Sequence, residues 1–186
     1  MRACPDQYLG NLAESIGNTK FPMRKTASER SNRPCLILIL ESPHIDEFQG
    51  ELGPAKGFTG KMIRQYLPDA LGHAVIKDMG LVLLNAVQYQ CSLGSNTIVY
   101  RDRIFRATWN QGGRENFIAR LKSVLMPEDL VMNCCTKGND FEVNVPLRSL
   151  VECAVREVFP QAKTMRRMHP ASWKNQAYRI AEWRYY

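Results

Sequence analysis

The sequence lacks several features that would assign a protein to a class at once. No stretch approaches the roughly 20 apolar residues that a membrane span needs, and the first residues form no continuous apolar signal segment. The six cysteines contain no C-x-x-C pair, and several lie inside apolar runs, where a reduced thiol packs as a small apolar side chain. These absences predict a cytoplasmic protein with reduced thiols and no membrane partner.

Repeats, low-complexity segments and a phosphate-binding loop are also missing. The segment Gly57-Phe-Thr-Gly-Lys-Met62 is too short and wrongly placed to match the G-x-x-x-x-G-K-[ST] pattern of nucleotide-binding loops. The chain is therefore not expected to be a solenoid or a P-loop nucleotidase.

What the sequence does contain is an apolar core and an excess of positive charge. The 186 residues are 45% hydrophobic and carry a formal net charge of +7, so we expect one folded domain over residues 1–186 with a basic surface. Nucleic acid is the partner that such a surface suits best, and we expect the protein to act as a monomer.

Apolar runs without polar alternation predict buried parallel strands at 36–40, 80–85 and 129–135, with a short fourth strand at 163–168. Helical spacing of apolar residues predicts helices at 5–17, 59–67, 114–125 and 146–159, and an aromatic, basic helix over 171–186. Strands that alternate with helices indicate a three-layer α/β/α sandwich with a central four-stranded parallel sheet.

Polar residues follow the predicted strands at the point where each strand ends. They are Glu41, Ser42, His44, Asp46, Glu47, Asn85, Asn133 and His169. Because the carboxyl ends of parallel strands share one edge, we expect these side chains to converge there.

Each residue alone has a simpler explanation: His169 could cap a turn, Asn85 could cap a helix, and Glu41 could pair with a surface cation. Phe58 could pack in the core, and Trp173 could anchor the last helix.

Four segments resemble, in order, the motifs of the uracil-DNA glycosylase superfamily. They are Leu40-Glu-Ser-Pro-His44, Gly53-Pro-Ala-Lys-Gly-Phe-Thr-Gly-Lys61, Leu83-Leu-Asn85 and His169-Pro-Ala-Ser172. The resemblance spans about residues 35 to 175 and is most similar to the thermostable iron-sulfur branch. It implies hydrolysis of the N-glycosidic bond of a flipped-out pyrimidine, which leaves an abasic site in DNA.

Breaking this bond builds positive charge on the sugar and negative charge on the departing base. The resemblance implies that His169 donates to the base and that a carboxylate among Glu41, Asp46 and Glu47 faces the sugar or positions water. It further implies that Asn85 reads the pyrimidine edge and that Phe58 stacks on the ring. Ser42 and His44 would also contact the substrate. The DNA contacts would come from Trp173, as a wedge in the gap left by flipping, and from Arg166, Arg167, Lys174 and Arg179 at phosphates.

Two departures from the family pattern bear on the substrate. Ser42 stands where the uracil-specific enzymes carry a water-activating Asp, and His44 stands where an aromatic ring screens C5 of the base. The base is therefore either uracil or a 5-modified pyrimidine, such as the hypermodified cytosine of some phage genomes, which would suit anti-phage defence. The paired N-terminal cysteines of the iron-sulfur branch are missing, with Cys4 alone nearby, so we expect no cluster, metal or other cofactor.

The expected activity is that of a monofunctional DNA glycosylase. Two other functions are compatible with the same sequence. The chain could be a catalytically silent nucleic-acid-binding module, which the residues at positions 42 and 44 suggest. It could also be a nucleosidase that breaks the same bond in free nucleosides, for which Trp173 and the basic C-terminal segment would not be needed.

Overall fold

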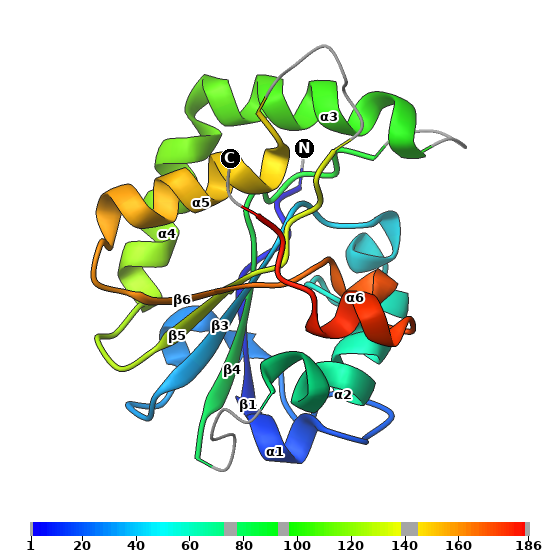
Figure 1. Ribbon diagram of the computed structural model, residues 1–186, viewed down its shortest axis with the longest axis vertical. Coiled ribbons are helices and arrows are strands. Elements are labelled where there is room, and N and C mark those ends of the chain that lie inside the picture. The colour runs from blue at the N-terminus through cyan, green and yellow to red at the C-terminus, as the bar shows by residue number, and fades with distance from the viewer. Residues whose placement is uncertain (1, 73–77, 93–96, 139–144, 185–186) are drawn as a thin grey trace.

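A computed structural model describes residues 2–72, 78–92, 97–138 and 145–184 (Figure 1). Within these residues the chain forms a six-stranded sheet in the order β2-β1-β4-β3-β5-β6. The strands are β1 (Gln7–Asn11), β2 (Lys25–Thr26), β3 (Cys35–Leu40), β4 (Gly80–Asn85), β5 (Leu130–Asn133) and β6 (Lys163–Arg166). Strands β3 to β6 pair in parallel, whereas β1 pairs antiparallel with both β4 and β2. The four predicted strands are thus present and parallel, but the prediction of a four-stranded, purely parallel sheet is not confirmed, because the sheet is mixed and has two further strands.

Helices cover both faces of this sheet (Figure 1). The α-helices are α1 (Leu12–Ser15), α2 (Phe58–Leu71), α3 (Thr97–Thr108), α4 (Arg114–Val124), α5 (Leu147–Val158) and α6 (Gln176–Ile180). Short turns of other helix types are η1 (Ala27–Glu29), η2 (Ile45–Phe48), η3 (Trp109–Gly113) and η4 (Pro170–Ser172). None of the described helices has the length and apolar character that crossing a membrane requires.

Strand β3 lies at the centre of the molecule, and all six of its residues are buried. Ile37 and Ile39 pack in a core with residues of α3, α4 and α5, whereas Leu36 and Leu38 pack in a second core with α1 and α2. Burial on both faces explains why the strand is apolar without alternation. The carboxyl end of β3 is thereby held rigidly between two layers, and the chain leaves it at Glu41.

The first predicted helix, over 5–17, is wrong for most of its length. Residues Gln7–Asn11 form β1, and helix α1 covers only Leu12–Ser15. Tyr8 packs in one core and its neighbour Leu9 in the other, which is the two-residue alternation of a strand. The helical spacing in the sequence came from joining this strand to the turn that follows it.

Two helix boundaries also differ from the prediction. Helix α2 begins at Phe58, after Gly57, and continues through Pro68 to Leu71, although the sequence suggested a start at Thr59 and an end before the proline. The predicted helix over 171–186 is reduced to η4 and α6, and residues 181–184 follow without regular structure. Helix α3 was not predicted. Residues 93–96 and 139–144 lie outside the described residues.

Candidate active site

A cavity of about 320 Å³ lies at the carboxyl edge of the parallel strands. Seven of the residues that the sequence singled out line it, namely Glu41, Ser42, His44, Asp46, Glu47, Phe58 and His169. They come from the loop after β3, the start of α2 and the segment after β6. The predicted convergence at this edge therefore holds for residues that are up to 128 positions apart (169 − 41) in the chain.

Glu41 is the first residue after β3 and is 3% exposed. Its carboxylate accepts hydrogen bonds from the Ser42 hydroxyl at 3.2 Å and from the Thr136 hydroxyl, and the Arg101 Nε lies 3.6 Å from its Oε2. Burial raises the pKa of this carboxyl above its ordinary value, while the guanidinium and the two hydroxyl donors offset part of the rise. The result is a buried carboxyl with a defined orientation at the cavity wall.

Glu47 is a second buried carboxyl, 4% exposed. It accepts hydrogen bonds from the Ala55 N–H at 3.0 Å, from the Asn85 Nδ2 at 3.4 Å and from the Cys4 thiol at 3.8 Å. Burial raises its pKa to about 7, although the hydrogen bonds favour the ionised form. Glu47 can therefore exchange a proton near neutral pH, as a general acid or base does.

Asn85 does not line the cavity, contrary to its predicted role at the pyrimidine edge. The side chain is 2% exposed and lies behind Glu47, to which its amide nitrogen donates. Its Oδ1 atom is buried without a hydrogen-bond partner. In this arrangement Asn85 supports Glu47 rather than meeting a base directly.

His169 precedes the η4 turn, and its imidazole is partly buried. Nδ1 accepts a hydrogen bond from the Ala171 N–H at 3.3 Å, so the proton of the neutral ring is carried by Nε2. Two effects lower the pKa of His169 to about 4: burial, which is the larger, and repulsion from the Arg101 charge. At neutral pH the side chain is an uncharged hydrogen-bond donor.

The rim of the cavity is formed by exposed side chains. Phe58 is 55% exposed as the first residue of α2. The His44 Nδ1 lies 3.1 Å from the Asp46 carboxylate, which is the distance of an ion pair when the ring is protonated. It also lies 3.3 Å from the backbone nitrogen of Asp46, whose N–H donates to the neutral ring. Both side chains are about half exposed, and His44 therefore does not close the cavity.

Trp173 and Arg167 cannot have the DNA contacts predicted for them. Trp173 is fully buried in the core beside α2 and donates its indole N–H to the Met168 carbonyl at 2.8 Å, so it anchors the chain after His169. Arg167 is 8% exposed and donates to the Ala70 carbonyl at 2.6 Å and to Glu182 at 2.7 Å. Both side chains are held by the fold itself.

The other residues predicted at phosphates differ in their surroundings. Arg166 is partly exposed, 3.8 Å from Glu152, and Lys174 is exposed. Arg179 pairs with Asp69 and donates to the Trp173 carbonyl. The amide of Asn133, which follows the same strand-end pattern as the site residues, bonds Glu152 and the Arg148 carbonyl instead.

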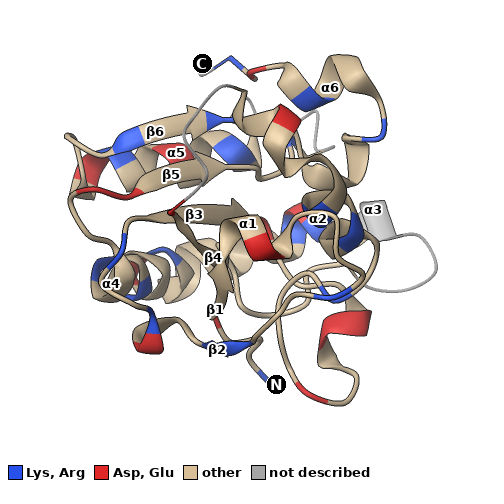
Figure 2. Ribbon diagram, turned by 90° about the horizontal axis from the view of Figure 1, so that it is seen from below, with Lys and Arg blue, Asp and Glu red and all other residues tan. Residues whose placement is uncertain are grey.

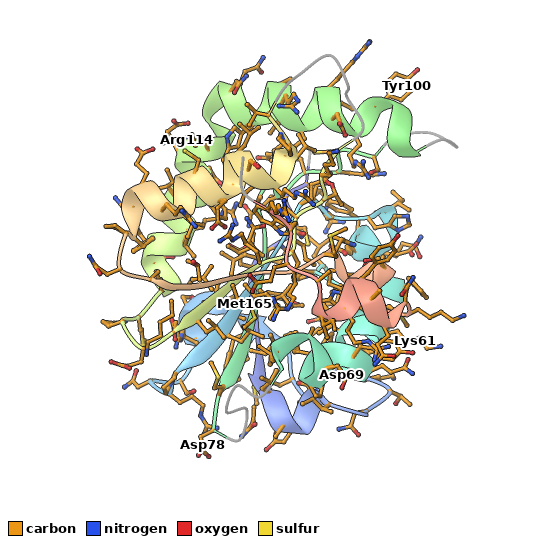
Figure 3. The ribbon with its side chains drawn as sticks, in the orientation of Figure 1. Lys61, Asp69, Asp78, Tyr100, Arg114 and Met165 are labelled. Carbon is orange, nitrogen blue, oxygen red and sulfur yellow. The ribbon has the colours of Figure 1, made fainter. Side chains whose placement is uncertain are left out.

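Arg101 and Thr136 line the cavity but were not predicted. Thr136 directly follows the third predicted strand, so the rule that located Glu41 could also have found it. Arg101 lies on α3, where large exposed side chains obscure the buried face in the sequence. One of them is Tyr100, which points outward and is 53% exposed (Figure 3).

Comparisons of the chain with protein-family models, with curated proteins and with solved structures found no match. Among the described residues, no group of three or more His, Cys, Asp and Glu side chains is arranged to hold a metal ion. The chemistry that the described side chains offer consists of a neutral imidazole donor, two buried carboxyls and an exposed aromatic ring around one cavity.

Proposed function

We propose that this protein is a DNA glycosylase that hydrolyses the N-glycosidic bond of a flipped-out pyrimidine. The observation that carries the proposal is the combination, on one cavity, of the neutral His169 imidazole with the buried carboxyls of Glu41 and Glu47. The four segments that resemble the uracil-DNA glycosylase motifs support it, since three of them supply residues to this cavity.

In the proposed reaction, the bond between C1′ and the base nitrogen breaks and the base takes both electrons. His169 Nε2–H donates to a carbonyl oxygen of the base as negative charge develops there, which stabilises the transition state more than the ground state. A carboxylate at the cavity wall faces the positive charge on the sugar and accepts a proton from the attacking water. The departing base anion takes up a proton in place of the one that water gave to the carboxylate, and the products are the free base and an abasic sugar.

The base is proposed to be uracil or a pyrimidine with a 5-substituent. The open position of His44 favours the second group, because the half-exposed ring leaves room at the rim where an aromatic screen would exclude a substituent. Phe58 supplies the stacking surface for the ring. The protein is proposed to act as a cytoplasmic monomer, and its five buried cysteines are free thiols.

A nucleosidase acting on free nucleosides is the second candidate. The burial of Trp173 and Arg167 favours it, because the DNA contacts expected from the C-terminal segment are reduced to those of Lys174 and Arg166. The bond chemistry at His169 would be the same.

The deciding experiment uses oligonucleotides that contain uracil, mismatched or 5-modified pyrimidines, single- and double-stranded, read by strand cleavage in alkali. Free nucleosides are assayed in parallel for base release. We expect an abasic product from at least one oligonucleotide, with the rate reduced about 10²- to 10³-fold in H169A, and no change in K163Q, an exposed control. Release from nucleosides alone would favour the nucleosidase, and no release from any substrate would refute both.

A further inference from the structure

Arg101 reaches the candidate site from an element outside all four motif segments. It lies on α3, lines the cavity, and its side chain is 17% exposed. Its Nε is 3.6 Å from the Glu41 carboxylate and 3.3 Å from that of Asp102. The same cavity is lined by His169, so the guanidinium shares one space with both groups that the proposed reaction uses.

Asp102 fixes the position of Arg101 on its helix. The Asp102 side chain is buried, and its Oδ2 packs so closely against Gly138 that a Cβ atom there would lie 2.5 Å away. Gly138 has a φ of +87°, which also favours glycine. Helix α3 is thereby packed against the loop after β5, and this loop carries Thr136, the second hydroxyl donor to Glu41.

Two buried thiols near Arg101 and Glu41 are uncharged at neutral pH. Cys91, in the segment after β4, has a pKa raised to about 12 by burial, and burial also raises the pKa of Cys135, after β5. Among the described residues, the charges of Arg101, Glu41 and Asp102 act on one another here, and so does the charge of His169 when it is protonated.

We propose that Arg101 is a positioning residue of this site, which holds the Glu41 carboxylate in place, favours its ionised form and opposes protonation of His169. This inference rests on the proposed function. Glycosidic cleavage needs an anion near the sugar and a neutral hydrogen-bond donor near the base. One fixed cation serves both needs, since it attracts the carboxylate and repels a second positive charge.

The electrostatic surroundings of the two groups agree with this geometry. Burial raises the pKa of Glu41, and Arg101 is the largest of the influences that lower it again. For His169, Arg101 acts in the same direction as burial and lowers the pKa further. Removal of the positive charge would therefore raise the pKa of both groups.

The first test needs no substrate. The His169 ring is titrated by NMR in the wild type, R101Q and R101K, with H169N to assign its signals. We expect titration near pH 4 in the wild type, a rise of at least about half a unit in R101Q, and little change in R101K, which keeps the charge. An unchanged His169 titration in folded R101Q would overturn the inference. If R101Q does not fold, R101M, whose unbranched side chain fills similar space without charge, replaces it.

The second test uses the reaction itself. Protonation of either Glu41 or His169 removes activity on the acid side, so the acid limb of kcat/KM against pH should move to higher pH in R101Q and stay in place in R101K. If R101Q is active and its acid limb coincides with that of the wild type, the role of Arg101 is refuted but the proposed function is not. A wild type without any base release would refute the proposed function, while the NMR titration would still decide what Arg101 does to His169.

Discussion

At the scale of single residues, Glu47 is the clearest link between burial and chemistry. Its carboxyl is nearly inaccessible to solvent, yet each of its polar partners donates to it. These donors favour the ionised form, whereas loss of hydration favours the protonated form, and burial has the larger effect on its pKa. Because the folded protein holds this proton up to near neutral pH, its unfolding free energy should depend on pH.

Replacement of Glu47 by Gln should change how stability depends on pH. The pKa of Glu47 is raised from 4.5 to about 7, so between these values the folded protein holds a proton that the unfolded chain has lost. The wild type should then lose up to ~3 kcal/mol of unfolding free energy, relative to E47Q, as pH rises from 4.5 through 7. Urea unfolding at a series of pH values measures the difference.

E47Q is expected to fold because the Asn85 Oδ1, which has no partner, can accept from the new amide after the Asn85 side chain rotates. E128Q is the control, since Glu128 is 73% exposed and pairs with Lys163 at the surface. A constant difference between E47Q and the wild type across this pH range would show that Glu47 titrates normally.

Phe58 should affect substrate binding without affecting stability. Its ring is more than half exposed at the first position of α2, so F58A should change the unfolding free energy by no more than ~0.5 kcal/mol. Loss of base stacking should lower kcat/KM about 5- to 150-fold, which corresponds to roughly 1–3 kcal/mol. F58Y keeps the ring and should remain close to the wild type; steady-state base release that is equal in all three proteins would exclude a stacking role.

The sequence located most of the candidate site because the site follows from topology. Once β3 and β6 are parallel neighbours of β5, Glu41 and His169 must leave the same edge of the sheet. The direction of each side chain was not predictable in this way. Asn85 ends β4 at the same edge but points behind Glu47, to which its amide donates. Trp173 follows His169 but turns into the core, where it packs with residues of α2.

At the scale of elements, residues 181–184 form a C-terminal strap along the end of β5. Trp183 is 3% exposed, and its indole N–H donates to the Asn133 carbonyl at 3.1 Å. The guanidinium groups of Arg148 and Arg166 lie 4.9 Å and 5.7 Å from its ring. An aromatic ring in contact with two cations, with its polar hydrogen satisfied, is a strong anchor for an otherwise irregular segment.

W183A should therefore lower the unfolding free energy by about 3–5 kcal/mol, as large-to-small substitutions of buried aromatic residues do. W183F keeps the ring over the two guanidinium groups but loses the hydrogen bond to Asn133, and should lose only about 1 kcal/mol. Chemical denaturation compares the three proteins. If W183A unfolded within ~0.5 kcal/mol of the wild type, the strap would contribute little to the folded state.

Elements buried on both faces were the most predictable. Strand β3 is apolar throughout and β4 is apolar up to Asn85, and no other element explains such runs. Two strands at one side of the sheet were missed: β2 has only two residues, both exposed, and β1 has apolar residues that also fit a helix. Helix α3 was missed because its exposed side chains, such as Tyr100, obscure the buried stripe that contains Phe105.

At the scale of the whole molecule, the net charge of +7 is spread over many elements. Basic and acidic residues are scattered over many elements in the view of Figure 2. Several arginines are held by internal partners, as Arg167 is by Glu182 and Arg120 is by Asp6. Exposed lysines next to cavity-lining residues are better placed for phosphates, namely Lys61, Lys137 and Lys174.

Binding of a DNA duplex should accordingly weaken with salt through these three lysines. Each lies within three positions of a residue that lines the cavity, and each phosphate contact adds about −0.9 to the slope of log K against log salt concentration. In fluorescence anisotropy titrations, the slope of the triple variant K61Q/K137Q/K174Q should be smaller in magnitude than that of the wild type by roughly 2–3. K163Q changes an exposed lysine at the amino end of β6, far along the strand from His169, and should leave the slope unchanged. Equal slopes in the triple variant and K163Q would mean that DNA does not lie across the cavity mouth, and the nucleosidase would then become the better proposal.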